Sequence, residues 1–147
     1  MRILIERFIA APVADVWAAW NDPADIVQWN AASDDWHTTR STVDLRIGGV
    51  FTSRMEAKDG SFGFGFAGTY TSVVDYKLIE FSMGDTRTVR VEFAEQGGGV
   101  LLRQSFDSEA THSIEQQRDG WQAILNRFAN HVEMKLAEKK LDPASSK

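Results

Sequence analysis

Polar side chains that could take part in chemistry gather in a segment rich in threonine and valine, 36–47, and beyond the glycine pair 48–49 that follows it. Strand alternation places His37 on one face of this segment and Asp44 on the other. If the glycine pair forms a two-residue hairpin turn, the register brings Asp44 near Arg54 on the returning strand. Two interpretations stay open. These residues form ion pairs on a solvated convex face, or an arginine such as Arg54 lies at a cavity mouth and pairs with a ligand carboxylate or phenolate.

Other arrangements known from catalytic and metal sites are missing from the sequence. The histidines, His37, His112 and His131, are far apart and do not have metal-ligand spacing. No serine occupies a nucleophile elbow with histidine and aspartate partners. The glycines at 97–99 join two strands and do not open a helix, so they do not predict a phosphate site. We therefore expect no catalytic residue, no metal site and no cofactor.

Aromatic residues are the most informative feature. Phe62, Phe64 and Phe66 alternate with small residues, and strand geometry places all three on one face. An exposed face of this kind would be an interface between copies of the chain, whereas an inward face would line an apolar cavity. We expect the inward orientation. The residues predicted to form the cavity wall are Trp29, Phe51, Met55, Phe64, Phe66, Trp121, Leu125 and Phe128.

The elements that must position these residues follow from periodicity and turn signals. A strand at 2–10 precedes two short helices, the first beginning near Pro12 and the second at Pro23 with Asp22 as its cap. A long helix at 113–139 carries one apolar stripe. Between the helices, six strands joined by short turns predict an antiparallel meander; they are expected at 36–47, 50–57, 61–74, 78–83, 86–94 and 100–106. The sequence therefore predicts an α+β fold in which a curved sheet of six to seven strands wraps around the C-terminal helix.

Composition limits the possible partners. The 147 residues suit one domain, which we place at 1–140, with a polar tail at 141–147. The net charge of −5 and scattered basic residues argue against nucleic-acid binding. The chain has no cysteine, which excludes disulfides and thiolate metal sites and favours a reducing cytoplasm. No apolar run approaches the length of a membrane span.

Several local patterns together resemble the START-like (SRPBCC) superfamily, and within it the homologues of the chaperone Hsp ATPase activators. The resemblance runs from about residue 2 to about residue 136, and its motifs lie at 11–17, 44–51, 59–60, 68–70 and 120–125, with Trp29 and Met55 between them. It implies the helix-grip fold and, for many members, binding of lipids, hormones, polyketides or other hydrophobic molecules. The family signature consists of turn glycines and core aromatics, so it assigns no catalytic residue here.

The leading functional hypothesis is binding of a small hydrophobic molecule, whether aromatic, polycyclic or lipid-like, by a monomer or homodimer. A polyketide-cyclase-like enzyme is one alternative, with His37 or Arg54 as the assisting acid or base. A cofactor that stimulates a chaperone ATPase is another. This last alternative is the weakest, because the resemblance implies an additional domain for which the chain has no room.

Overall fold

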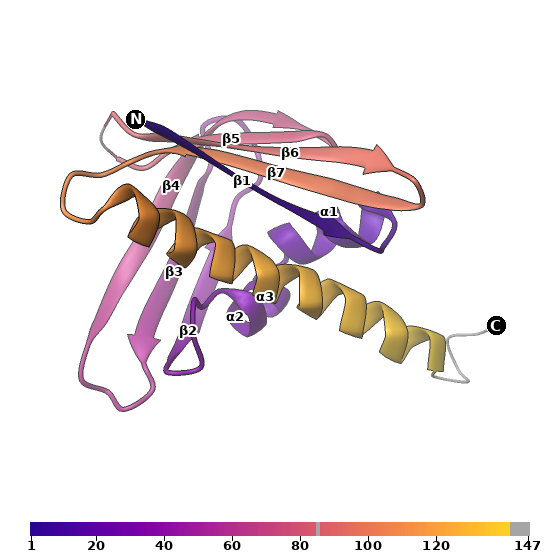
Figure 1. Ribbon diagram of the computed structural model, residues 1–147, viewed down its shortest axis with the longest axis horizontal. Coiled ribbons are helices and arrows are strands. Elements are labelled where there is room, and N and C mark those ends of the chain that lie inside the picture. Colours follow the sequence, from indigo (N-terminus) through magenta and orange to yellow (C-terminus); the bar gives the residue numbers. More distant parts are fainter. Residues whose placement is uncertain (85, 142–147) are drawn as a thin grey trace.

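The computed structural model describes residues 1–84 and 86–141 (Figure 1). Its strands are β1 (Arg2–Ile9), β2 (Trp36–Val43), β3 (Val50–Ala57), β4 (Gly63–Val74), β5 (Leu78–Ser82), β6 (Thr88–Gln96) and β7 (Gly99–Asp107). Its helices are α1 (Val13–Asn21), α2 (Pro23–Trp29) and α3 (Ile114–Leu141). Within the described ranges, no helix combines the length and the apolar character needed to cross a membrane. The predicted polar tail lies outside these ranges from residue 142 onward.

All seven strands form one antiparallel sheet in the order β1-β7-β6-β5-β4-β3-β2. Consecutive strands from β2 to β7 are neighbours, as the short turns predict, and β1 joins the sheet beside β7. The segment with α1 and α2 therefore connects the two opposite edges of the sheet. The predicted α+β architecture is confirmed.

The sheet is strongly bent, and α3 lies across its concave side. Figure 1 shows β2, β3 and β4 turning steeply away from the direction of β1, β5, β6 and β7. Register shifts after Thr38 in β2 and after Tyr70 in β4 accompany the bend, as expected because a β-bulge bends its strand and increases the local twist. The arrangement of a curved sheet gripping one long helix is the predicted helix-grip fold.

Local capping signals in the sequence set where α2 and α3 begin. The side chain of Asp22 accepts a hydrogen bond from the backbone nitrogen of Ala24 at 2.9 Å, and Pro23 is the first residue of α2. Before α3, the Gln116 nitrogen donates to Ser113 Oγ and the Ser113 nitrogen donates to Gln116 Oε1, both at 3.1 Å. This reciprocal pair is a capping box, which satisfies two backbone donors at the helix start.

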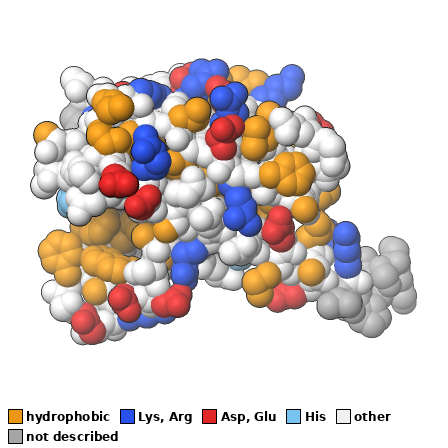
Figure 2. Space-filling view, in the orientation of Figure 1, with side chains coloured by type: hydrophobic (Ala, Val, Ile, Leu, Met, Phe, Trp, Pro, Cys, Tyr) orange, Lys and Arg blue, Asp and Glu red, His pale blue; other side chains and the backbone are white. Residues whose placement is uncertain are grey.

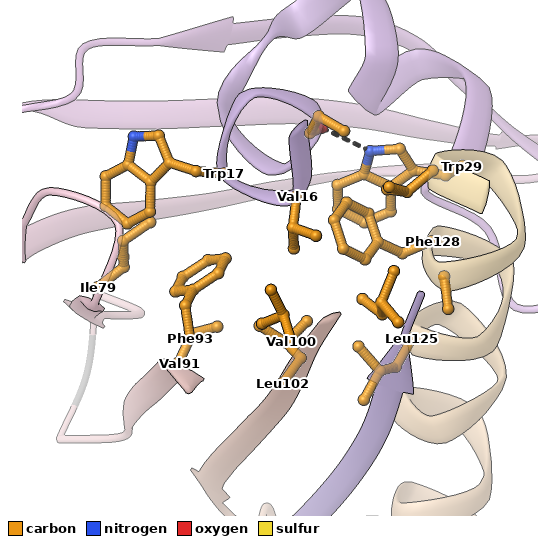
Figure 3. Packing of buried hydrophobic residues seen from close by; sticks show 14 of the residues in the cluster. Val16, Trp17, Trp29, Ile79, Val91, Phe93, Val100, Leu102, Leu125 and Phe128 are labelled. Atoms are coloured by element: carbon orange, nitrogen blue, oxygen red, sulfur yellow. Dashed lines mark hydrogen bonds between the residues drawn. The ribbon is translucent and has the colours of Figure 1, made fainter. Parts of the chain in front are cut away.

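The hydrophobic core lies between the sheet and the helices (Figure 3). Residues with inward strand parity, such as Val91 and Leu102, are fully buried. Leu125, Phe128 and Val132 of α3 are also buried, which confirms that the predicted stripe of this helix faces the concave side of the sheet.

The connection between β2 and β3 differs from the predicted two-residue turn. β2 ends at Val43, and residues 44–49 form a longer loop. The Gly48 nitrogen donates to the Tyr70 oxygen at 2.8 Å, and the Tyr70 nitrogen donates to the Gly49 oxygen at 2.9 Å. Gly48 has a φ of 87°, which glycine adopts without strain. The glycine pair therefore fastens the loop to β4 and does not close a tight hairpin.

The predicted proximity of Asp44 and Arg54 is wrong for the same reason. Because Asp44 lies beyond the end of β2, its carboxylate pairs with Arg46 at 2.9 Å. Arg54 pairs with Glu56, two residues along its own strand, at 3.3 Å. Both pairs are solvent-exposed, which agrees with the interpretation of these charges as surface ion pairs.

A buried carboxylate links α2 to α3. Asp25 is almost fully buried, and its Oδ1 lies 2.7 Å from Lys135 Nζ and 2.9 Å from His131 Nε2. Burial raises the pKa of Asp25, but the hydrogen bonds from Lys135 and His131 outweigh it and leave the pKa below the ordinary value of 3.8. The folded state therefore favours the ionised carboxylate.

This cluster predicts an acid-dependent contribution to stability. Because the folded-state pKa of Asp25 is depressed, its stabilisation is present above the unfolded-state pKa and is lost as the pH falls through the folded-state value. At neutral pH, Asp25→Asn is expected to lower the free energy of unfolding by about 1–3 kcal/mol. Urea unfolding should show this difference shrinking below the ordinary aspartate pKa. Asp35→Asn serves as the control, because Asp35 is exposed. If Asp25→Asn lowers the free energy of unfolding equally at neutral pH and below the ordinary aspartate pKa, the charge-based explanation is contradicted.

Candidate functional site

A cavity of about 250 Å³ lies between the bent part of the sheet and the helices. The apolar walls of the cavity and its few polar groups come from elements that are far apart in the sequence. Its lining residues are Trp20, Ile26, Trp29, Asn30, Val43, Phe51, Ser53, Met55, Phe64, Phe66, Tyr70, Phe81, Gln104, Trp121, Ile124 and Leu125.

The sheet wall is built by strand pairing. Met55 of β3 is paired with Phe64 of β4, and Ser53 with Phe66, so these four side chains share the concave face. The position opposite Phe51 is Gly68. A Cβ atom at this glycine would lie 2.5 Å from the ring of Phe51 and 2.8 Å from the ring of Phe81. The missing side chain therefore lets these two rings meet over β4, with their centroids 4.7 Å apart.

The wall from α3 is held in place by ring stacking. Trp121 stacks on Phe106 of β7 with centroids 3.9 Å apart and planes 12° apart, and its ring also meets Phe66 edge to face. Ile124 and Leu125 follow on the next turn of the helix and line the same cavity. The helical spacing of these residues positions them together because residues three and four apart share a face.

The wall from α1 and α2 centres on two tryptophans. Trp29 is buried, and its indole Nε1 donates to the backbone oxygen of Ala19 at 2.9 Å, drawn as a dashed line in Figure 3. Trp20 stacks on Trp29 with centroids 5.2 Å apart. The hydrogen bond fixes the orientation of the Trp29 ring and satisfies a carbonyl in the last turn of α1.

The structure brings together seven of the eight residues predicted to form the wall: Trp29, Phe51, Met55, Phe64, Phe66, Trp121 and Leu125. The eighth, Phe128, does not line the cavity. Its ring is fully buried and packs edge to face on Trp20 and Trp29, at 5.0 Å and 4.9 Å. Phe128 therefore supports the tryptophan wall from behind.

Sequence reasoning missed the polar members of the lining, Asn30, Ser53, Tyr70 and Gln104. A usable signal was present for two of them. Ser53 lies on the same face of β3 as Phe51 and Met55. Tyr70 lies on the same face of β4 as Phe64, because the two are an even number of residues apart. Strand parity alone could therefore have placed Ser53 and Tyr70 on the cavity face.

One end of the cavity is bordered by exposed aromatic side chains. Phe62 and Phe64 have exposed fractions of 63% and 40%, and both rings contact Trp36. Figure 2 shows hydrophobic side chains gathered at the lower left, near the turn 58–62 that joins β3 to β4, where the surface is hollowed. The expectation that all three phenylalanines are enclosed is wrong for Phe62. We define Trp36, Phe62 and Phe64 as the aromatic rim.

Charged candidates from the sequence lie away from the cavity. Neither His37 nor Arg54 lines it. Among residues 1–84 and 86–141, no group of three or more histidine, aspartate or glutamate side chains is arranged to hold a metal ion. The phenol of Tyr70 is the titratable group in the lining, and burial together with the negative charge of Asp44 raises its pKa to about 12. Tyr70 is therefore a neutral hydrogen-bonding group at physiological pH.

Comparison with known proteins finds solved structures that share the fold. A solution structure of an AHSA1-like protein from Aeromonas hydrophila is 50% identical, with a TM-score of 0.87 over 92% of this chain and 94% of that one. A solution structure of a protein from Cytophaga hutchinsonii is 43% identical, with a TM-score of 0.79 and the same coverage. A crystal structure from Nitrosomonas europaea shares the fold at 21% identity, with a TM-score of 0.76 over 93% of this chain and 97% of that one. No curated protein sequence matches the chain.

A family model gives the clearest assignment. The model described as activator of Hsp90 ATPase homolog 1-like protein matches residues 10–133. This range contains both short helices, the strands β2 to β7 and the part of α3 that lines the cavity. The match confirms the resemblance inferred from the motifs. The chain belongs to the activator of Hsp90 ATPase homolog 1-like family, within the START-like superfamily.

Proposed function

We propose that this protein binds a small hydrophobic molecule, aromatic, polycyclic or lipid-like, in the cavity between its sheet and α3. One observation carries the proposal: a space of about 250 Å³ persists in the centre of the fold although large aromatic side chains surround it. A core that only stabilises the fold is close-packed and has few voids larger than a water molecule. A largely apolar cavity with a few polar groups is the usual form of a small-molecule site.

The seven wall residues named above would supply the contact surface for the ligand. Met55 adds adaptability, because a thioether side chain fits irregular shapes. The aromatic rim supplies an apolar path between solvent and the cavity, and its exposed rings are the kind of surface that marks a ligand entrance. We include in the proposal a cytoplasmic location and a monomeric or homodimeric state.

The binding role is favoured over an enzymatic role. The cyclase-like alternative depended on His37 or Arg54 acting as an acid or base within reach of a bound substrate. Neither side chain lines the cavity. The titratable group that does, Tyr70, has a pKa of about 12, which is far from the value that suits proton transfer at neutral pH.

Filling the cavity from α3 tests the proposal. Ile124 lines the cavity and is only half-buried, so Ile124→Trp should project the larger ring into the space without breaking the core. The neutral fluorescent probe N-phenylnaphthylamine brightens in apolar surroundings and should bind the parent with a Kd in the micromolar range. Ile124→Trp is expected to weaken this binding about tenfold or more.

Met134→Trp is the matched control, because Met134 is an exposed residue of the same helix. This variant should bind the probe as the parent does. If Ile124→Trp and Met134→Trp both bind with the parent's affinity, or if the parent does not bind the probe, the proposed function is wrong.

A further inference from the structure

Three polar side chains of the cavity lining are without a hydrogen-bond partner among the residues that the structure describes. Ser53, Tyr70 and Gln104 line the cavity with exposed fractions of only 5%, 4% and 6%. Among the described residues, none of these three side chains forms a hydrogen bond or an ion pair with another residue, and their polar atoms stay accessible, since the one fully enclosed side-chain atom without a partner is Ser41 Oγ. Buried polar groups in proteins are nearly always hydrogen-bonded, because desolvation without a partner is costly. Because the polar atoms of these three groups are open to the cavity, a molecule that fills it must supply their partners or leave them desolvated and unpaired.

These groups are all electrically neutral. Ser53 and Tyr70 are hydroxyls that donate and accept hydrogen bonds, and the amide of Gln104 does both through different atoms. Burial and the charge of Asp44 keep the Tyr70 phenol protonated, with a pKa of about 12. The cavity can therefore offer donors and acceptors without offering a charge.

Among the described residues, no lysine, arginine or histidine lines the cavity. Several cations on the elements that form its walls pair with carboxylates outside the cavity. Arg127 of α3 pairs with Asp34 at 2.8 Å. Arg54 of β3 pairs with Glu56, and Lys135 of α3 pairs with Asp25. An anionic group that entered the cavity would lose its hydration without gaining a counterion, and the nearby negative charge of Asp44 would repel it.

We propose that the cavity selects uncharged, mostly apolar ring compounds whose hydroxyl, carbonyl or amide groups hydrogen-bond to Ser53, Tyr70 and Gln104, and that it rejects carboxylates with the same carbon skeleton. This inference rests on the proposed function and narrows its ligand class. It excludes free fatty acids and aromatic acids as the favoured ligands. It also replaces the sequence-based interpretation in which an arginine at the mouth pairs with a ligand carboxylate.

Three compounds with one skeleton test the selectivity by displacement of N-phenylnaphthylamine at neutral pH. Cinnamamide carries a neutral amide, cinnamate carries a carboxylate of nearly the same shape, and propenylbenzene carries a methyl group. Cinnamamide is expected to displace the probe at a concentration about tenfold or more below that required for cinnamate. The reason is that cinnamate must bring an ionised carboxylate out of water into a cavity without a counterion. Cinnamate that binds as tightly as cinnamamide, or more tightly, would overturn the inference.

Variants then identify the groups responsible. Tyr70→Phe and Gln104→Leu keep the apolar bulk of each side chain and remove its polar atoms. Each should weaken cinnamamide binding by about fivefold to tenfold, the size of a lost hydrogen bond, and should leave propenylbenzene binding unchanged or slightly improved. Equal losses for both compounds would show a packing role and would overturn the assigned polar contacts.

The outcomes separate this inference from the function on which it rests. Suppose that Ile124→Trp blocks the binding of N-phenylnaphthylamine and propenylbenzene, but that cinnamamide and cinnamate bind the parent equally well. The cavity then binds ligands as proposed, and only the inferred selectivity is wrong. If none of the compounds binds, the proposed function and the inference both fail.

Discussion

Replacing Phe128 with alanine is expected to lower the free energy of unfolding by about 3–5 kcal/mol, the range for removal of a fully buried aromatic ring. Phe128 has no exposed surface and packs on both Trp20 and Trp29 from the centre of α3. The variant would lose the transfer free energy of the ring and leave a void behind the tryptophan wall. Chemical denaturation of the parent and the variant, analysed with a common slope, measures the loss directly.

Met134→Ala provides the comparison on the same helix. Met134 is exposed, so its truncation should change the free energy of unfolding by no more than about 0.5 kcal/mol. Similar unfolding curves for Phe128→Ala and Met134→Ala would contradict the placement of α3 against the concave face of the sheet.

Truncating Trp29 should lower the free energy of unfolding by a comparable amount. A second substitution at this position separates the contribution of the ring contacts from that of the indole hydrogen bond. Trp29→Ala removes a buried ring that contacts Trp20 and Phe128, with an expected loss of about 3–5 kcal/mol. Trp29→Phe retains an aromatic ring but removes the indole donor to the Ala19 carbonyl. Its expected loss is about 1–3 kcal/mol, because that buried carbonyl is left without its partner.

The same melting or denaturation measurement serves both Trp29 variants. An equal loss for Trp29→Phe and Trp29→Ala would show that the hydrogen bond dominates and that the ring contacts contribute little. A neutral Trp29→Phe would show that the bond to Ala19 is dispensable for joining α1 to α2.

Much of the fold could be predicted because its signals are local and periodic. The α3 stripe appears at helical spacing, and the Ser113–Gln116 capping box needs only four residues. The glycine pair 48–49 does not reveal the loop 44–49, because a tight turn and a longer loop use glycine for the same reason. What distinguishes them here is the pair of hydrogen bonds to Tyr70, a contact between distant parts of the sequence.

The candidate site could be predicted in outline but not in depth. Strand parity places Phe62 and Phe64 on one face, yet it does not say where the helix ceases to cover that face, so Phe62 proved to be exposed. Helical periodicity places Leu125 and Phe128 on one stripe, but only tertiary packing puts Leu125 at the cavity and Phe128 behind Trp29. The periodicity of a sequence tells which face of a helix or strand a residue occupies. The distance of that residue from the cavity depends on how the helices and strands pack together.

The indole N–H signals provide the most direct test that the cavity binds a small apolar molecule. The chain has five tryptophans; Trp20, Trp29 and Trp121 line the cavity, and Trp36 lies in the aromatic rim. Trp17 is buried against Phe93 outside the lining and serves as an internal control. The measurement is a proton–nitrogen NMR titration of these signals with N-phenylnaphthylamine. We expect saturable shifts at Trp20, Trp29 and Trp121 and little change at Trp17, whereas shifts confined to Trp36, or no shifts at all, would contradict binding in the cavity.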